Sequence, residues 1–176
     1  MPSKEPEIDP SSLLDFLRLV GGELSRAIVL VAAGGTALTL LGVKPSTRDI
    51  DFTGPGEDIE AFKRALGGIP HGMKVDTWPG GQVFTQFLPS DYLARSKPIK
   101  ELTNIDLRAL HPVDIIVTKI GRLDERDEQD IEACIREFKI SKSAVAKRAK
   151  RVAYVGNEEL FRSNVEYALR RFFGSK

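Results

Sequence analysis

Two different spacings of apolar residues follow one another at the start of the chain. In "PSSLLDFLRLVGGELSRA" (residues 10–27), apolar side chains recur every three or four positions, which predicts a packing helix capped by Ser11 or Ser12. The next run, "AIVLVAA" (residues 27–33), has no polar interruption and predicts a strand that is buried on both faces. The chain therefore begins with a helix that leads into a buried strand.

The alternation of strand and helix continues beyond this strand. "TALTLLGV" (residues 36–43) predicts a short helix that ends at Gly42, and "RDIDF" (residues 48–52) predicts a second strand. "GEDIEAFKRALGG" (residues 56–68) has apolar side chains at helical spacing before a glycine stop. The resulting βαβα order indicates an α/β fold.

Three alternating segments in the middle of the chain indicate further strands, as in an α+β mixed sheet. "GMKVDTW" (residues 72–78) and "GQVFTQFL" (residues 81–88) are joined by a Pro-Gly-Gly sequence, so we expect them to form a strand pair. "NIDLRAL" (residues 104–110) alternates in the same way. These segments complete the strand content that we expect of the core.

From Pro112 onward the apolar spacing is helical. Pro112 stands at the first helical position and Asp114 in the first turn, which is a favourable helix start. Three further helical segments follow it. We therefore predict an α/β core with its N-terminal helix over residues 1–110, and a C-terminal helical region packed on that core over residues 111–176.

Composition and charge narrow the class of protein. The 26 basic and 25 acidic residues give a net charge of +1, which argues against strong attraction of the whole molecule to nucleic acid or to a membrane. No apolar run approaches the roughly 20 residues of a membrane span, and the polar start lacks a signal-peptide core. The single cysteine, Cys134, fits a reducing compartment. We expect a cytoplasmic protein with no membrane partner.

Two aspartates in the second predicted strand are the first candidate for chemistry. Side chains alternate along a strand, so Asp49 and Asp51 point to one face, roughly 7 Å apart. Two ionised carboxylates this close repel unless a cation is bound between them or the face is open to water. Ligation by carboxylates without cysteine or histidine suits Mg²⁺ or Mn²⁺. The alternative is an exposed strand face with solvated aspartates.

A glycine turn precedes this aspartate pair. Gly34 and Gly35 end the apolar strand and lead directly into a predicted helix, which offers backbone N–H groups and a helix dipole to a phosphate. Thr36 can add a hydroxyl hydrogen bond, although it can equally be an ordinary helix cap. A phosphate-binding turn beside a metal-binding pair is the combination that a nucleoside triphosphate requires.

The combined motifs resemble a known superfamily. "GGTAL" followed by "TRDIDF" is similar to the nucleotidyltransferases of the polymerase-beta type, in which a Gly-Gly or Gly-Ser turn precedes a D-x-D strand. The branch that includes the abortive-infection, AbiEii-like nucleotidyltransferases also has a later K…R-D…D-I pattern. Here that pattern falls within "TKIGRLDERDEQDI" (residues 118–131). The resemblance covers about residues 28–131 and implies a nucleotidyltransferase-like core with a C-terminal helical region.

The resemblance implies roles for individual residues. Asp49 and Asp51 would be the metal ligands, and a third carboxylate, on a later strand, would act as base or shared ligand. We expect Asp76 in that position, with Asp106 as the alternative. Lys119 would contact either the triphosphate or a structural carboxylate. Gly34, Gly35 and Thr36 would hold the phosphates.

The activity that follows is transfer of a nucleoside monophosphate from a nucleoside triphosphate to an unidentified acceptor, either RNA or protein, with Mg²⁺ or Mn²⁺. The alternative is a noncatalytic binding or regulatory module that keeps the fold. A role in a toxin–antitoxin or phage-defence pair, through a partner protein, is a further hypothesis.

The sequence leaves two alternative roles for each of two basic features. Arg48 adjoins Asp49, but strand alternation directs it to the opposite face, so we expect it to anchor the strand or to meet a partner. The segment 139–151 carries several basic residues and no acidic one, which indicates either a solvated helix face or a surface for RNA or an acidic partner.

Overall fold

The five-stranded main sheet is mixed, as the strand pattern predicts. In this computed structural model, which describes residues 5–174, the strand order is β3-β2-β1-β7-β6. β1 runs antiparallel to β2 and parallel to β7, while β2 runs parallel to β3 and β6 antiparallel to β7. The strands are β1 (Ile28–Ala32), β2 (Ile50–Gly54), β3 (Val75–Pro79), β6 (Lys97–Leu102) and β7 (Ile105–Ala109). The mixed α/β fold class is thereby confirmed.

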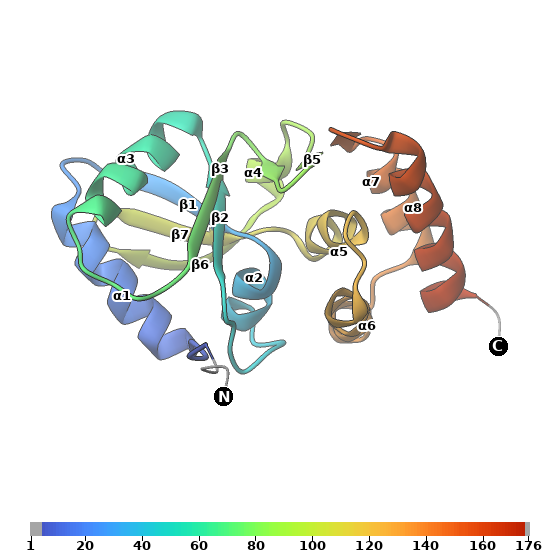
Figure 1. Ribbon diagram of the computed structural model, residues 1–176, viewed down its shortest axis with the longest axis horizontal. Helices are drawn as coiled ribbons and strands as arrows, with labels where there is room; N and C mark the ends of the chain where they lie inside the picture. Colours follow the sequence, from blue (N-terminus) through green and yellow to red (C-terminus); the bar gives the residue numbers. More distant parts are fainter. Residues whose placement is uncertain (1–4, 175–176) are drawn as a thin grey trace.

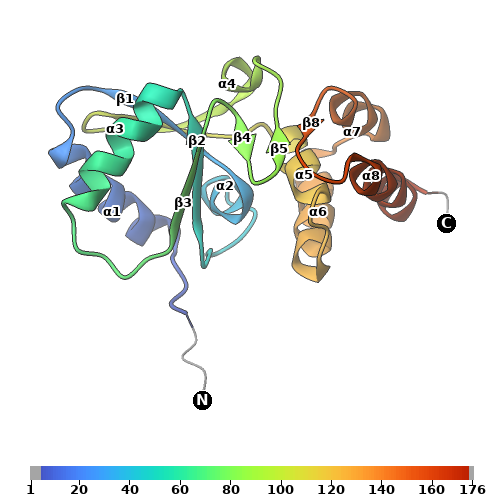
Figure 2. The same ribbon diagram turned by 45° about the horizontal axis from the view of Figure 1, so that its top comes forward.

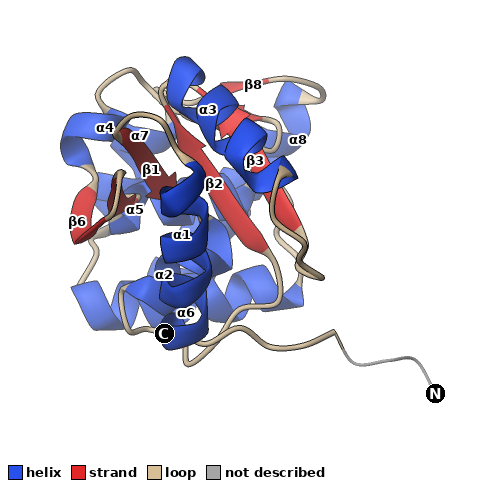
Figure 3. Ribbon diagram, turned by 90° about the vertical axis from the view of Figure 1, so that its left-hand side faces the viewer, coloured by secondary structure: helices blue, strands red, loops and turns tan. Residues whose placement is uncertain are grey.

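Helices cover both faces of this sheet. α1 (Pro10–Glu23) and α3 (Gly56–Gly67) pack on one face, in front of the strands in Figure 3. α2 (Gly34–Leu40) and α5 (Pro112–Ile120) lie on the other face, between the sheet and the remaining helices in Figure 1. Phe52 of β2 meets Phe62 of α3 edge to face at 5.6 Å between ring centroids. Because strand side chains alternate, Asp51 faces the α2 side.

The first helix is capped two or three residues earlier than the sequence suggests. The Asp9 carboxylate accepts a hydrogen bond from the Ser12 amide at 2.8 Å, so the expected cap at Ser11 or Ser12 is wrong. Pro10 then takes the first helical position, where its missing N–H costs nothing. Just before the cap, Ile8 forms an antiparallel bridge with Thr47. The N-terminal segment is thus tied to the loop that precedes β2.

The expected pairing of residues 72–78 with residues 81–88 is also wrong. β3 pairs with β2 instead, and this pairing extends into the following turn, where the Gly80 amide donates to the Gly54 carbonyl at 2.7 Å. The second segment forms the hairpin β4 (Gln82–Val83) and β5 (Gln86–Phe87). β5 then pairs with β8 (Ala153–Tyr154) in a separate three-stranded sheet (Figure 2).

A helical region begins at Pro112. Besides α5, the pairing of its strand β8 with β5 joins it to the rest of the protein. Its other helices are α6 (Glu125–Phe138), α7 (Lys142–Ala149) and α8 (Glu158–Phe173). β8 falls inside a segment whose pattern predicts helix, because its pairing with β5 outweighs local propensity. The short helix α4 (Tyr92–Arg95) lies between β5 and β6 in sequence. The first four residues of the predicted core and the last two of the predicted helical region lie outside the described residues.

Two further findings bear on the class of protein. Within residues 5–174, no helix combines the length and the apolar character needed to cross a bilayer. Cys134 is fully buried in α6, and burial raises the pKa of its thiol to about 12. A thiol with this pKa is protonated at neutral pH, which is the state of a packing residue rather than a nucleophile.

Candidate functional site

A polar pocket of about 420 Å³ lies where the α2 side of the sheet meets α5 and α6. Its walls come from the first turn of α2, the loop before β2, β2 itself, the β4–β5 hairpin and the two helices. Its charged lining residues are Glu7, Lys44, Arg48, Asp49, Asp51, Lys119, Arg122, Arg126, Asp127 and Asp130. A pocket lined by so many charges of both signs is suited to an ionic ligand.

The three carboxylates expected from the sequence lie on the strand side of this pocket, and two of them line it. Asp51 lies in β2 and is in register with Asp76 of β3, and Asp49 lies just before β2. Asp49 and Asp51 line the pocket, whereas Asp76 lies beside Asp51 outside the lining set. The Lys74 ammonium lies 3.9 Å from an Asp49 oxygen and 3.7 Å from an Asp76 oxygen. The three aspartates are therefore brought together, with an ammonium between the outer two.

Asp51 is the most perturbed carboxyl in this group. Its side chain is only 7% exposed, and its Oδ1 atom is buried without a hydrogen-bond partner. Burial raises the pKa of Asp51 to about 7, and the negative charges of Asp76 and Asp49 add to the effect. Lys119 and Lys74 oppose this rise only in part. A buried oxygen without a partner is an energetic cost that a bound cation would remove.

The two glycines allow α2 to approach these acidic groups. Gly34 has φ +52°, a left-handed conformation, and a Cβ added to it would lie 3.1 Å from Asp51 Oδ2. A Cβ on Gly35 would lie 3.0 Å from the Thr47 hydroxyl oxygen. Both glycines line the pocket. Side chains at these positions would crowd the carboxylate and the loop, so the glycines keep this wall open.

Thr36 is placed differently from the sequence-based expectation. Its hydroxyl donates to the Asp49 carbonyl at 3.0 Å and accepts from the Asp51 amide at 2.9 Å. The side chain is fully buried and does not line the pocket. Thr36 therefore holds the backbone of the D-x-D segment against α2, and both hydrogen bonds of its hydroxyl are used for this purpose.

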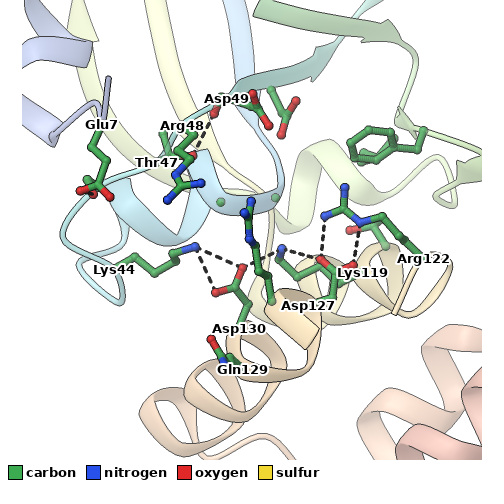
Figure 4. Close-up of a pocket in the computed structure, with 18 of the residues that line it drawn as sticks. Glu7, Lys44, Thr47, Arg48, Asp49, Lys119, Arg122, Asp127, Gln129 and Asp130 are labelled. Carbon is green, nitrogen blue, oxygen red and sulfur yellow. Dashed lines mark hydrogen bonds and ion pairs between the residues drawn. The ribbon is translucent and has the colours of Figure 1, made fainter. Parts of the chain in front are cut away.

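The helical wall of the pocket is a chain of ion pairs. In Figure 4 the ammonium groups of Lys44 and Lys119 converge on Asp130, while Lys119 and Arg122 meet at Asp127. Lys119 lies 2.8 Å from Asp130 and 3.2 Å from Asp127. Arg122 reaches both oxygens of Asp127, at 2.8 and 2.9 Å. Lys119 thus lines the pocket, as expected, and is held by two carboxylates.

The electrostatics of Asp127 differ from those of Asp51. Burial alone would raise the pKa of Asp127, but the Arg122 hydrogen bonds and the Lys119 charge hold it below the ordinary value. Asp127 also accepts a hydrogen bond from the Asp124 amide and closes a capping box at the start of α6. It is therefore ionised and positions its cations rather than taking up a proton.

The structure adds pocket residues that the sequence analysis did not identify. Lys44 pairs with Asp130 across 86 positions of sequence, and nothing in the local pattern around Lys44 signals this contact. Arg48 lines the pocket, so its expected placement on the opposite face is wrong. The reason is that β2 begins only at Ile50, and strand alternation does not extend back to Arg48. Among residues 5–174, Arg48 and Arg126 form no ion pair although both line the pocket.

The alternative third carboxylate, Asp106, lies elsewhere. It is on β7, two strands from β2, and its ladder partner on β1 is Val29. Asp51 meets β1 at Ala33, four residues and roughly 13 Å further along that strand. The Asp106 carboxylate pairs with Arg108 at 3.6 Å. The geometry therefore brings Asp76, and not Asp106, to the aspartate pair.

The chemistry of the aspartate cluster suits a divalent cation. Oxygen ligands from carboxylates are those that Mg²⁺ and Mn²⁺ prefer, and the Asp51 Oδ1 atom has no other partner. Within the described part of the chain, however, no three His, Cys, Asp or Glu side chains converge as metal ligands would. The Lys74 ammonium lies where Asp49 and Asp76 would meet. The residues therefore fit a magnesium ion by the chemistry of their donor atoms, and the carboxylates would have to turn toward the ion to bind it.

One comparison with known proteins gives a match. A family model described as "Nucleotidyltransferase of unknown function (DUF6036)" matches residues 12–172. This range contains both walls of the pocket and extends through α8. No curated protein and no solved structure matches the chain.

Proposed function

Because the chain belongs to this family of nucleotidyltransferases of unknown function, we propose that it transfers a nucleoside monophosphate from a nucleoside triphosphate to an acceptor hydroxyl, with Mg²⁺ or Mn²⁺. The observation that carries the proposal is the Asp51 carboxylate. It is buried, has an oxygen without a partner, and is flanked by Asp49 and Asp76. Opposite it, Lys44, Lys119 and other cations line the same pocket.

The strand wall would hold the metal. Asp49 and Asp51 are the proposed ligands, and Asp76 is the proposed base or shared ligand. A bound Mg²⁺ would stabilise the charge of the triphosphate and lower the pKa of the attacking hydroxyl. The acceptor oxygen forms a bond to the α-phosphorus, the bond to the bridging oxygen breaks, and pyrophosphate leaves with that electron pair. Asp76 would take up the hydroxyl proton.

The phosphates would lie against the glycines and the cationic wall. Gly34 and Gly35 leave space next to Asp51, and Lys119 is fixed by its two carboxylate partners. Arg48 and Arg126 contribute charge that no described carboxylate neutralises through an ion pair. A triphosphate carries several negative charges, so unpaired cations beside it would contribute binding free energy.

The acceptor and the cellular context belong to the same proposal. An RNA or a protein can supply the hydroxyl, and an AbiEii-like role in a toxin–antitoxin or defence pair would involve a partner protein. The four exposed lysines in and around α7 are the described surface that suits an RNA or an acidic partner: Lys139, Lys142, Lys147 and Lys150. By contrast, Arg148 in the same segment is buried and paired, so it is not available to a partner.

A noncatalytic nucleotide-binding or regulatory module is the second candidate function. The position of Lys74 between Asp49 and Asp76 favours it, because an ammonium that neutralises these carboxylates can replace a metal structurally. In that case the pocket would bind nucleotide without metal and without turnover. The two candidates therefore differ in their dependence on Mg²⁺.

The deciding experiment is transfer of label from α-labelled nucleoside triphosphates. The protein is incubated with Mg²⁺ or Mn²⁺ and with candidate acceptors such as tRNA or protein, and the same reaction is run with EDTA. We expect metal-dependent labelling that is lost in the Asp49→Ala, Asp51→Ala variant and kept in Asp106→Asn, the matched carboxylate two strands away. Labelling that survives the double substitution would contradict the proposed site.

Nucleotide binding without metal and without transfer would support the noncatalytic module instead. Isothermal calorimetry with each nucleoside triphosphate, in EDTA and in Mg²⁺, separates this case from the catalytic one. Metal-independent affinity that is unchanged by Asp51→Asn is the result expected of the module.

A further inference from the structure

One aromatic residue lines this otherwise charged pocket. The Phe84 side chain is 42% exposed and belongs to the pocket wall. Its neighbour in the wall, Val83, is almost fully buried and offers little surface to a ligand. Phe84 is therefore the large apolar surface that a ligand in the pocket would meet.

The backbone at Phe84 is strained. Phe84 and Thr85 form the two-residue turn between β4 and β5, and Phe84 has φ +53°. Hairpin turns that need a positive φ at this position strongly favour glycine, and a bulky side chain there is a genuine outlier. The Gln82 side-chain amide donates to the Phe84 carbonyl at 2.9 Å and helps to hold the turn. An aromatic residue in a turn position that favours glycine is an outlier from which a functional hypothesis for the ring can be drawn.

Two other flat groups contact the Phe84 ring and hold it in place. The Trp78 and Phe84 rings lie 4.6 Å apart between centroids, and the Arg122 guanidinium lies 5.6 Å from the Phe84 centroid. Arg122 is itself held by both oxygens of Asp127. In Figure 4, Arg122 is at the opposite end of the pocket from Lys44 and Glu7. Phe84 therefore presents a fixed aromatic surface at the Arg122 end.

We propose that Phe84 is the stacking surface for the base of the bound nucleotide, with Trp78 and Arg122 as its support. This inference rests on the proposed function, since it assigns one part of the nucleotide to one part of the same pocket. The base is the flat and least charged part of a nucleoside triphosphate, and Phe84 is the matching surface in a charged wall. Stacking uses the face that every base has, so this contact binds all four bases with little selectivity.

The test uses Trp78, which is the single tryptophan of the chain. The protein is titrated with non-hydrolysable analogues of ATP, CTP, GTP and UTP in Mg²⁺, and with inorganic tripolyphosphate, by calorimetry and by tryptophan emission. We expect the analogues to bind and to change the Trp78 emission, because the base contacts the ring that Trp78 touches. Tripolyphosphate has no base, so it is expected to bind without this change.

Substitution of Phe84 should then separate base from phosphate. Phe84→Ala is expected to weaken binding of all four analogues by about 5- to 100-fold and to leave tripolyphosphate affinity unchanged. Phe84→Gly relieves the turn strain and also removes the ring, so it should fold at least as well as the parent and lose the same affinity. Phe84→Tyr keeps the ring and should keep the affinity.

The matched control is Phe87→Ala. Phe87 is in the same small sheet, has a similar exposure of 36%, and does not line the pocket. If the parent binds the analogues and the Phe84 variants bind them equally well, the stacking inference is wrong and the proposed function stands. A loss confined to one base would also overturn it, because the claim is base-tolerant stacking. If the parent binds no analogue at all, the proposed function and the inference fail together.

Discussion

Two buried aspartates in this molecule have opposite surroundings. Asp114, in the first turn of α5, is 0% exposed, and its carboxylate accepts hydrogen bonds from Arg148 on both oxygens. Arg148 is also bonded to Asp91 at 2.8 Å, so the buried charges are matched within the protein. Asp51 is almost as buried, at 7% exposure, but its Oδ1 atom has no partner and its pKa is raised to about 7.

The difference separates a buried charge that is fully paired within the protein from one that is not. The Asp114 carboxylate joins α5 to α7 through Arg148, and the connection is complete without any ligand. The Asp51 carboxylate lines the pocket next to two further acids, and its charge is balanced only in part by Lys119 and Lys74. A carboxylate of the second kind is destabilising until a cation arrives, which is typical of binding sites. Four predictions follow from this contrast.

The largest effect on the free energy of unfolding is expected at the buried pair of Asp114 and Arg148. Asp114→Ala leaves the Arg148 guanidinium buried with only the half-exposed Asp91 as partner, so we expect it to lower the free energy of unfolding by about 3–5 kcal/mol. Urea unfolding at neutral pH measures this change. Glu158→Ala, which breaks the exposed Arg162–Glu158 pair, is the control and should cost about 0.5 kcal/mol or less. A cost below about 1 kcal/mol for Asp114→Ala would remove the structural role assigned to it.

Asp51→Asn should raise the free energy of unfolding, whereas Asp114→Ala should lower it. The ordinary pKa of 3.8 rises to about 7 in the folded protein, so between these values the folded state holds a proton that the unfolded state has released. Stability of the parent therefore falls as pH rises through this window and is lowest above it. The asparagine variant cannot ionise, so at high pH it should exceed the parent by up to about 4 kcal/mol. Parallel pH profiles of unfolding, without divalent metal, would contradict this prediction.

Bound Mg²⁺ should offset the destabilisation caused by the ionised Asp51 carboxylate. A ligand at 100 times its dissociation constant stabilises the state that binds it by about 2.7 kcal/mol, so Mg²⁺ should raise the free energy of unfolding of the parent at pH above 7. The Asp51→Asn variant should gain much less, because the proposed ligand is gone. Melting curves in a MgCl₂ series, with EDTA as the reference, measure the difference. An equal gain in both proteins would place the bound ion elsewhere.

Much of the core could be predicted because its signals are local. The apolar run of β1, the alternation of β7 and the helical spacings of α1, α3 and α5 are each contained in a few consecutive residues. The D-x-D motif could be recognised from consecutive residues alone, although only Asp51 lies within β2 and Asp49 precedes the strand. Local periodicity therefore located the centre of the candidate site.

The sequence-based predictions that were wrong concern contacts between residues that are distant in sequence. β3 forms a five-residue parallel ladder with β2, about 25 residues earlier in the chain, and β8 pairs with β5, which lies 67 residues before it. The Thr36 hydroxyl could be identified as a polar group near the turn, but its partners are backbone atoms 13 and 15 residues away. Likewise, no pattern around Asp114 indicates that it meets Arg148, 34 residues later. The sequence could not say which buried aspartate is paired.

The smallest predicted effect concerns the ammonium beside the open aspartates. Lys74 is 62% exposed in its side chain and lies 3.9 and 3.7 Å from Asp49 and Asp76, so it partly neutralises them when no metal is bound. Lys74→Met keeps the length of the side chain and removes the charge. In EDTA it should lower the free energy of unfolding by under about 1 kcal/mol, because the carboxylates then repel without compensation.

In saturating Mg²⁺ the sign of the Lys74→Met effect should change. The metal and the ammonium carry the same sign and would occupy the same space between Asp49 and Asp76, so the lysine opposes metal binding. Removing it should strengthen Mg²⁺ affinity, measured by calorimetry, and make the variant at least as stable as the parent. Lys63→Met, at an exposed lysine paired only with Glu60, should show no such reversal. Weaker Mg²⁺ binding in Lys74→Met would mean that the lysine assists the site rather than standing in for its metal. The contrast with Asp114 would then narrow, because the aspartate cluster around Asp51 would also depend on a cation that the protein itself provides.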